Sequence, residues 1–394
     1  MKPMKKILGL LLALCLIAGC TSAFAAGIPV EQVKIGYITI GDENEGYSAN
    51  HLNGLKEAQA ALGISDDQVL CKYNVPETED AYEAAIDLAE QGCNIIFATS
   101  FGHESYVFQA AAEYPNIQFC HATGNSAMNS ELTNVHNYFY AVYESRYVSG
   151  VVAGMKLAQM IEDGTITAEN AKIGYVGAFP FAEVISGFTS FFLGARSQCP
   201  SVTMEVRYTN SWGDMALEKE TAEALIADGC VLISQHADTT GAPSACEAAG
   251  VPCVGYNISM LPVAPNTALT SAAGDWGAYV TYAVKCLIDG EEIARDWCKG
   301  YAEGAVYTTE LNDSIVAPGT AEKVAELEEA FKAGTVKVFD TSTFTVNGET
   351  LTSYTTAYGL EGIEMVSDGE FHESSVRSAP YFDILIDGIT AVVE

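Results

Sequence analysis

The sequence predicts an α/β protein made of two similar, doubly wound, Rossmann-like lobes joined by a hinge, with a small C-terminal β extension. At 394 residues the chain exceeds what one small hydrophobic core can accommodate. Strand-like and helix-like segments alternate along it, which is typical of parallel sheets covered by helices. Segments of the first half recur in the second half in the same order: KIGY at 34–37 and 172–175, Gly-Cys before an apolar run at 92–96 and 229–233, and a helix followed by Cys at 109–120 and 244–253. A repeat of this kind predicts two lobes with a cleft between them.

Each element of the first lobe has its own signal in the sequence. Apolar and β-branched runs predict strands at 33–40, 69–75, 94–99 and 117–121. The run at 94–99 is continuously apolar, as expected for a parallel strand buried on both faces. Apolar residues at helical spacing predict helices at 52–62, 78–92 and 105–113.

The rest of the chain continues the alternation. A long helix is expected at 144–161, where Gly150 and Gly154 indicate close approach by another element. After the repeat that begins at Lys172, helices are expected at 276–288, returning the chain to the first lobe, and at 320–333. A strand at 336–345, hairpins after 346 and a docked strand within 381–394 complete the prediction. The expected lobes are 28–145 with about 270–300, and 146–269 with about 301–345, followed by an extension at 346–394.

The N-terminus has the pattern of a secretion signal. Three lysines precede an apolar core that is too short to span a bilayer, and small residues lead directly into Cys20. Residues 1–19 therefore read as a lipoprotein signal peptide, with Cys20 acylated and anchoring the protein outside the cytoplasm. Cleavage after the Ala-Phe-Ala sequence at 23–25 is the alternative, and it would release a secreted protein.

Charge and cysteine content exclude some classes of function. The formal net charge of −32 disfavours binding to nucleic acid or to anionic lipid headgroups. The eleven cysteines include no CxxC pair, so neither a zinc ribbon nor a disulfide framework is indicated. Most lie within apolar stretches and are expected to be small buried side chains.

Candidate ligand-binding residues lie in the loops that follow the predicted strands. In open parallel sheets, ligands bind outside the carboxyl ends of the strands. The loops in both lobes combine aromatic rings with amides, imidazoles and carboxylates, which suits a flat heteroaromatic ring: rings stack on its faces and polar groups contact its edge. Ordinary packing is the competing explanation for each aromatic residue. The candidates are Tyr47, Asn50, His51, Phe101, Gly102, Phe179, Glu183, Trp212, Gln235, His236, Asp238, Asn257 and Trp276.

The sequence gives no support for an enzyme. It contains no GxSxG, HExxH, GxxxxGK[ST] or GxGxxG motif. His236 and Asp238 are two residues apart, but a histidine that satisfies a loop or ligand hydrogen bond explains them more simply than a base and its orienting acid. The histidines are not at metal-ligand spacing, so no metal and no cofactor is expected.

Several motifs together resemble a known family. They are the cysteine after the signal core, Gly46-Tyr47, Ser100-Phe101-Gly102, the HATG sequence at 121–124, Ser-Arg-Tyr at 145–147, GAFP at 177–180, QHAD at 235–238 and DWGAY at 275–279. This set, spread over about residues 30–340, resembles the basic membrane protein family of lipoproteins. These are substrate-binding components of ABC importers with a periplasmic-binding-protein type I fold.

The resemblance implies a ligand and partners. Family members that bind purine nucleosides hold the base between aromatic rings, and by position Tyr47 and Phe179 would be the two stacking residues. The turn at 122–124 lacks the acid, and 270–276 lacks the lysine, that would hold a ribose, while Asn257 replaces a frequent aspartate. The QHAD and DWGAY segments are similar to those of the branch associated with a bare base such as adenine. The resemblance therefore implies a monomeric receptor for a purine nucleobase that works with ABC permease subunits. A purine nucleoside, another flat heteroaromatic ligand, and a ligand-sensing receptor without a transporter are the alternatives.

Overall fold

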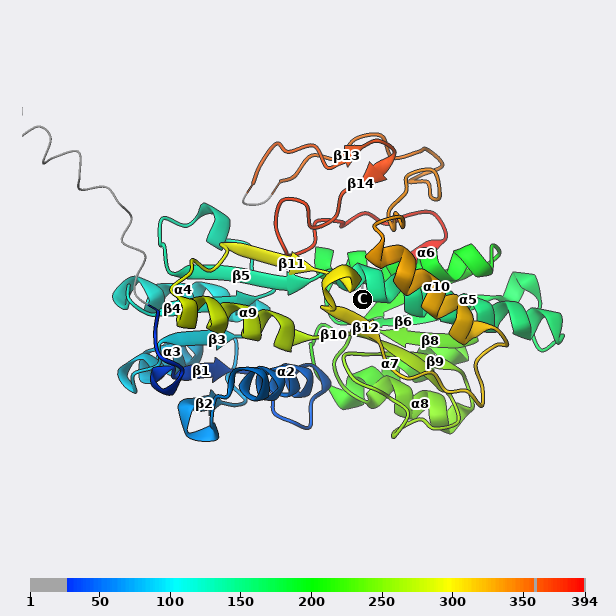
Figure 1. Ribbon diagram of the computed structural model, residues 1–394. Coiled ribbons are helices and arrows are strands. Elements are labelled where there is room, and N and C mark those ends of the chain that lie inside the picture. Colours follow the sequence, from blue (N-terminus) through cyan, green and yellow to red (C-terminus); the bar gives the residue numbers. More distant parts are fainter. Residues whose placement is uncertain (1–26, 358–359, 393–394) are drawn as a thin grey trace, which may run out of the picture.

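The first lobe is built on a parallel sheet. The computed structural model describes residues 27–357 and 360–392 (Figure 1). Its six-stranded sheet has the order β11-β5-β4-β3-β1-β2, and all of its neighbouring strands are parallel. The strands are β1 (Ile35–Ile38), β2 (Val69–Lys72), β3 (Ile95–Ala98), β4 (Gln118–Ala122), β5 (Val135–Tyr140) and β11 (Asp296–Lys299).

Helices cover both faces of this sheet. On one face, Ile35 and Tyr37 pack with Leu55 of α2 (Gly46–Leu62) in one core cluster that also includes residues of α9 (Trp276–Asp289). On the other face, Ile38 packs with Leu88 in a second cluster formed with α3 (Glu79–Glu90) and α4 (Glu104–Glu113). Side chains alternate between the two faces of a strand, so a sheet that is covered on both faces needs apolar residues at every position.

The second lobe repeats this architecture and confirms the two-lobe prediction. Its sheet order is β12-β10-β9-β8-β6-β7-β15, in which β7-β6-β8-β9-β10 repeats the order β2-β1-β3-β4-β5 of the first lobe. β12 is antiparallel to β10, and the other pairings are parallel. The strands are β6 (Lys172–Gly177), β7 (Thr203–Tyr208), β8 (Leu232–Gln235), β9 (Cys253–Tyr256), β10 (Ala268–Gly274), β12 (Val306–Thr308) and β15 (Ile389–Val392). The helices are α5 (Val142–Glu162), α6 (Ala182–Gln198), α7 (Met215–Ala227), α8 (Gly241–Ala249) and α10 (Thr320–Lys332).

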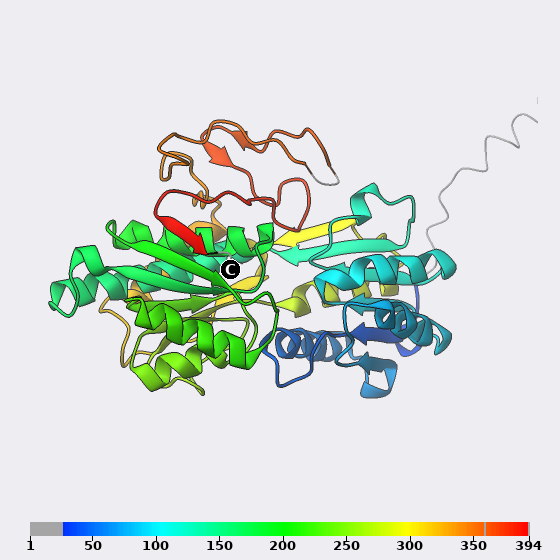
Figure 2. The same cartoon turned by 180° about the vertical axis from the view of Figure 1, so that it is seen from behind.

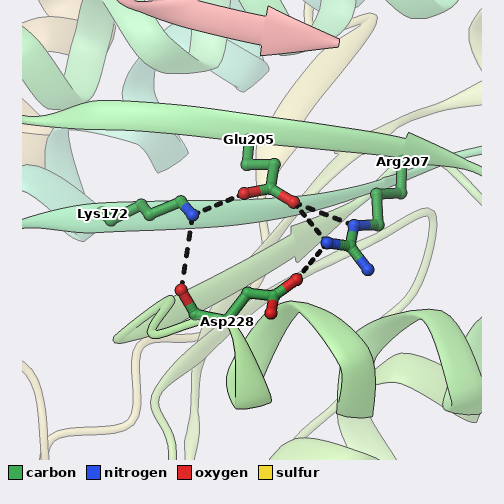
Figure 3. A network of polar contacts seen from close by, with 4 residues as sticks. All are labelled: Lys172, Glu205, Arg207 and Asp228. Atoms are coloured by element: carbon green, nitrogen blue, oxygen red, sulfur yellow. Dashed lines mark hydrogen bonds and ion pairs between the residues drawn. The ribbon is translucent and has the colours of Figure 1, made fainter. Parts of the chain in front are cut away.

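The repeated KIGY lysine has the same structural role in both lobes. Lys34 Nζ donates to the carbonyl of Gln91, the C-cap residue of α3. Lys172 Nζ lies 3.4 Å from the carbonyl of Asp228, the C-cap residue of α7 (Figure 3). A cation at a helix C-terminus satisfies carbonyl groups and complements the helix dipole. Both lysines lie at the amino ends of their strands, so the repeat that reveals the fold is distant from the carboxyl-end loops.

Figure 3 shows how this contact extends into a charged cluster in the second lobe. Glu205 accepts from Lys172 Nζ at 2.5 Å and from Arg207 Nη2 at 2.7 Å, and Arg207 also pairs with Asp228. These side chains are partly exposed, so solvent screens the pairs and each contributes little to stability.

The chain crosses between the lobes where β5 leads into α5, where β10 leads into α9, and at Gly300 after β11. β10 belongs to the second sheet up to Gly274, so the return to the first lobe starts at Asp275, whereas the sequence suggested about residue 270. The close approach expected at Gly150 is confirmed. A Cβ there would lie 2.0 Å from the carbonyl oxygen of Phe191 on α6, so only glycine allows this helix contact.

Other elements differ in extent from the sequence prediction. α2 begins at Gly46, six residues before the expected start, because the Glu45 carboxylate caps the backbone N–H groups of Tyr47 and Ser48 at 2.5 and 2.9 Å. The apolar periodicity of α2 begins only at Leu52, so the sequence pattern does not indicate the first turns of this helix. The expected strand at 336–345 is wrong, because this part of the chain contributes only an isolated bridge between Asp340 and Glu370.

The C-terminal extension packs along one side of both lobes. Figures 1 and 2 show it in orange and red, above β11 of the first lobe and α6 of the second. It contains the short hairpin β13 (Val366–Ser367) and β14 (Glu370–Phe371), and it ends in β15, which pairs with β7. The docked C-terminal strand is therefore confirmed at Ile389–Val392.

The signal peptide and Cys20 lie outside the described residues. Among the helices within 27–357 and 360–392, none is both long and apolar enough to cross a bilayer. Cysteines in this part of the chain are free thiols, and most are buried, including Cys93, Cys120 and Cys230. Burial raises the pKa of the Cys93 and Cys230 thiols to about 11, which keeps both protonated and unreactive.

Candidate ligand-binding site

A small cavity lies between the two lobes, and the space inside it and at its opening to solvent is about 330 Å³. It is at the carboxyl ends of the strands in both sheets, where ligands of open parallel sheets bind. Its lining residues are Ile40, Tyr47, Ser100, Phe101 and Thr123 from the first lobe and Glu183, Trp212, His236, Asp238 and Tyr256 from the second.

Tyr47 is fixed in the first turn of α2. Its hydroxyl donates to the carbonyl oxygen of Thr99 at 2.6 Å, at the end of β3. Its ring meets Trp276 edge to face, with centroids 5.9 Å apart, and only 7% of Tyr47 is exposed. The backbone N–H of Gly46 donates across the cleft to the carbonyl of Asp238 at 3.1 Å. The helix start that carries Tyr47 is therefore attached to both lobes.

A row of aromatic rings runs along one edge of the cavity. Phe101 faces Phe181 across the lobes at 5.5 Å between ring centroids. Phe179 stacks on Phe181 at 5.1 Å and meets Trp212 at 5.0 Å. Phe101 and Trp212 line the cavity, whereas Phe179 packs behind Trp212. Phe101 and Phe181 are 40% and 39% exposed, so two neighbouring rings from different lobes both present apolar surface.

Glu183 and His236 form a buried polar pair. His236 Nε2 lies 3.3 Å from Glu183 Oε1. Burial raises the pKa of Glu183 to about 7, although the nearby Arg146 guanidinium opposes this. Burial, followed by repulsion from Arg146, lowers the pKa of His236 well below its ordinary value, so the imidazole is neutral. The neutral ring can donate one hydrogen bond to Glu183, and its Nδ1 atom has no protein partner.

Asp238 is the second carboxylate of the cavity. Its Oδ1 atom accepts from Asn257 Nδ2 at 2.8 Å, and the residue is 6% exposed. Burial raises its pKa well above the ordinary value, and the neighbouring acids Glu45 and Glu218 add to the effect. Asn257 takes a left-handed backbone conformation with φ 65°, which asparagine tolerates better than most residues. This turn directs the amide towards Asp238.

Tyr256 and Arg146 extend the site beyond the sequence candidates. Tyr256 ends β9 and lines the cavity, and the guanidinium carbon of Arg146 lies 3.6 Å from the centre of its ring. Arg146 is completely buried, and its Nη1 atom donates to the carbonyl of Gln235 at 2.6 Å. The Arg146 guanidinium stacks on one face of the Tyr256 ring and so holds the ring in position.

Thr123 shows backbone strain at the cavity wall. Its φ is 67°, although β-branched residues rarely adopt positive φ. Its hydroxyl is buried and has no hydrogen-bond partner within the protein. Strain of this kind concentrates at ligand sites, and here it follows directly after β4.

Several sequence candidates lie near the cavity but do not line it. His51 stacks on Trp276 at 3.9 Å inside the first-lobe core, and its Nδ1 pairs with the Tyr37 hydroxyl at 2.9 Å. Asn50 donates to the carbonyl of Gly274 at 2.9 Å and so holds α2 to the crossover at the end of β10. The Gln235 side chain donates to the carbonyls of Ala237 and Thr239, which fixes the loop that carries Asp238. Gly102 donates its N–H to Glu77 at 2.7 Å.

The electrostatic character of the cavity is one-sided. Its lining contains two carboxyl groups and no lysine or arginine. Burial favours the neutral form of both carboxyl groups, so such a site suits a neutral ligand whose edge can form hydrogen bonds with them. Within the described ranges, no group of three or more His, Cys, Asp or Glu side chains could hold a metal ion.

Comparison with known proteins identifies the family. A family model described as ABC transporter substrate-binding protein PnrA-like matches residues 37–338, which is most of the chain. The chain belongs to this Bmp family. The family consists of extracytoplasmic substrate-binding proteins of ABC transporters, not enzymes, so the resemblance seen in the sequence is confirmed.

Two relatives of this Bmp protein carry different ligand names. A purine-binding protein of Brucella abortus is 33% identical over 311 residues, covering 78% of this chain and 83% of the relative. A Haloferax volcanii protein, whose name gives it as an ABC transporter glucose-binding protein, is 29% identical over 85% of this chain and 81% of its own length.

Solved structures agree on the fold. An ABC transporter solute-binding protein from Aeropyrum pernix has a TM-score of 0.65 at 18% identity, covering 78% of this chain and 93% of its own. A solute-binding protein from Conexibacter woesei has a TM-score of 0.60 at 20% identity, covering 77% and 98%. The fold is therefore that of periplasmic-binding-protein type I proteins.

Proposed function

We propose that this Bmp protein is the lipid-anchored receptor of an ABC importer and that it binds a purine nucleobase, adenine-like, in the cavity between the lobes. The observation that carries the proposal is the composition of the cavity lining: aromatic rings, a histidine and two carboxyl groups, with no lysine or arginine. A purine base offers two flat faces and an edge with nitrogen-bound hydrogens, so it matches this lining. The Brucella abortus relative, named as purine-binding, supports the same ligand class.

Each lining group has a role in this proposal. Tyr47 from the first lobe and Trp212 from the second, with Phe179 behind it, would hold the ring faces, each pairing contributing about 0.5–1.5 kcal/mol beyond the buried area. Asp238 would accept from the exocyclic amine, and His236 with Glu183 would contact a neighbouring ring atom. The lining offers no cation to a phosphate. Lobe closure then excludes water and presents the loaded form to the permease.

Calorimetric titration tests the ligand. The mature protein is titrated with adenine, guanine, adenosine, guanosine and glucose under identical conditions. We expect adenine to bind most tightly, because it has an amine donor and needs no ribose contacts. Binding of glucose alone would contradict the proposal. Tighter binding of adenosine or guanosine than of adenine would show that the ligand is a purine nucleoside. Uptake of labelled adenine by cells with and without the gene then separates a transport receptor from a sensor.

The anchor is tested separately. Cys20 follows an apolar core and small residues, which supports lipidation. We expect the wild-type protein in the membrane fraction, with a lipid mass on its N-terminal peptide, and the Cys20→Ala variant without that lipid. An unmodified N-terminus after residue 25 in the wild type would establish the secreted alternative.

A further inference from the structure

A second chamber adjoins the purine cavity. The two share three lining residues, Phe101, Thr123 and Glu183, so they lie side by side. The outer chamber is larger and, with the space at its opening to solvent, measures about 1290 Å³ against about 330 Å³ for the purine cavity. Its further lining comes from the loop after β4, the start of α6 and the C-terminal extension: Asn125, Pro180, Phe181, Ala182, Tyr354, Arg377, Ala379, Pro380, Tyr381 and Asp383.

The extension wall of this chamber is fixed in place. Glu373 is buried, and its carboxylate accepts from the backbone N–H groups of Tyr381 and Phe382 at 2.6 and 3.0 Å. The same carboxylate accepts from the Ser186 hydroxyl on α6 at 2.9 Å, one turn after Glu183. On the other side, Ser378 donates to Asp296 of β11 at 2.7 Å. The loop that carries Tyr381 is therefore held against both lobes, and a preformed wall costs little ordering entropy when a ligand binds.

The chemistry of the wall favours an apolar or aromatic occupant. Phe101 and Phe181 are the exposed rings noted above, and both face the chamber with Pro180 and Pro380. The polar groups of the extension already have partners. Tyr354 donates to Asp383 at 2.9 Å, and Arg377 donates to the carbonyls of Ala379 and Pro380 and stacks on the Tyr381 ring. A ribose or phosphate needs several hydrogen-bond partners, and leaving them unmade is costly.

We propose that the outer chamber is a substituent subsite, so that the ligand of this protein is a purine carrying an apolar or aromatic group. The inference rests on the proposed purine site and goes beyond it. The family match ends at residue 338, so Tyr354, Tyr381 and their neighbours lie outside the part of the chain shared with the family model. The extension thus supplies one wall of the subsite, and residues of the two lobes supply the rest.

The test compares ratios of dissociation constants by calorimetry. Adenine, N6-benzyladenine, 9-benzyladenine and adenosine are titrated into the full mature protein. We expect at least one benzyl isomer to bind about fivefold more tightly than adenine, the increment of one well-packed aromatic contact. Adenosine should show no such advantage. Neither benzyl isomer exceeding adenine would overturn the subsite, whereas no heat from any purine would instead reject the purine site itself.

Two variants change the chamber in opposite ways. Phe181→Ala removes an exposed wall, and Asn125→Trp fills space from the first lobe. In both, the benzyl-to-adenine ratio should approach one. Tyr307→Ala is the matched control, because this tyrosine is 40% exposed and lines a separate groove beside α2. It should keep the ratio. Survival of the advantage in both chamber variants would overturn the proposal, because the ratio within each variant cancels general effects on folding.

Discussion

Replacing Asp238 by asparagine tests which group recognises the purine edge. One carboxylate oxygen is held by Asn257 at 2.8 Å, so the substitution keeps the size of the side chain while removing one acceptor from the cavity. The amide nitrogen would then face either Asn257 or the ligand amine, and both are donors. A buried donor left without an acceptor costs about 1–3 kcal/mol. The dissociation constant for adenine should therefore rise about 5- to 150-fold.

Calorimetry with two ligands makes this prediction specific. Asp238→Asn is titrated with adenine and with unsubstituted purine, which has no exocyclic amine. The loss should be large for adenine and much smaller for purine. The control is Asp313→Asn, which removes the same charge from an exposed position outside the cavity lining. Equal losses for both ligands, or no loss for adenine, would show that Asp238 does not read the amine.

Three further predictions concern stability. Tyr47→Phe removes the hydrogen bond to the Thr99 carbonyl and should lower the free energy of unfolding, measured in urea titrations, by about 1–3 kcal/mol while keeping the adenine affinity within a few-fold. Tyr47→Ala should lower both the stability and the adenine affinity. Equal adenine affinities in the two variants would exclude stacking by the Tyr47 ring. Burial raises the pKa of Glu218 to about 7 from 4.5, so its contribution to stability is present at low pH and is lost as the pH rises towards and through 7. The free energy of unfolding of Glu218→Gln, relative to that of the wild type, should therefore rise by an amount on the order of 3 kcal/mol between pH 5 and 8. A fall in this difference over the same range would contradict the raised pKa. Gly150→Ala places a Cβ against the Phe191 carbonyl and should destabilise the protein by about 1–3 kcal/mol, measured by thermal unfolding; an unchanged melting temperature would mean that α5 and α6 can separate freely.

The fold could be predicted from the sequence because its signals are local and repeated. Apolar runs such as 94–99 are unambiguous when both sheet faces are covered, and the KIGY lysines contact the carbonyls of equivalent helix C-cap residues in the two lobes. The strand expected at 336–345 failed for the opposite reason. Its apolar residues, including Phe339, pack into an aromatic cluster with Phe371 and Phe382, and the segment pairs with β14 only through the single bridge between Asp340 and Glu370.

The site could be predicted only in part. Loop position identified Tyr47, Phe101, Glu183, Trp212, His236 and Asp238, all of which line the cavity. Sequence cannot show which way a side chain points, so Trp276 and His51, stacked within the core, looked equivalent to them. Tyr256 was missed because it belongs to an apolar strand and only its position at the strand end exposes it to the cavity. Its neighbour Arg146 lies 89 residues from Gln235, the residue it bonds, so no local pattern links them.

The extension also has a mechanical consequence for lobe motion. Its strand β15 is part of the second sheet, and Glu373 bonds to α6, so it moves as one body with the second lobe. It contacts β11 of the first lobe through Ser378, which donates to Asp296 at 2.7 Å, and through Ser374 beside Cys298. A rotation that carried β11 away from the extension would break the bond between Ser378 and Asp296, whose net contribution to the closed form is about 1 kcal/mol. The same rotation would separate Phe101 of the first lobe from Phe181 of the second. The aromatic row would then divide between the lobes, and the extension would remain beside α6.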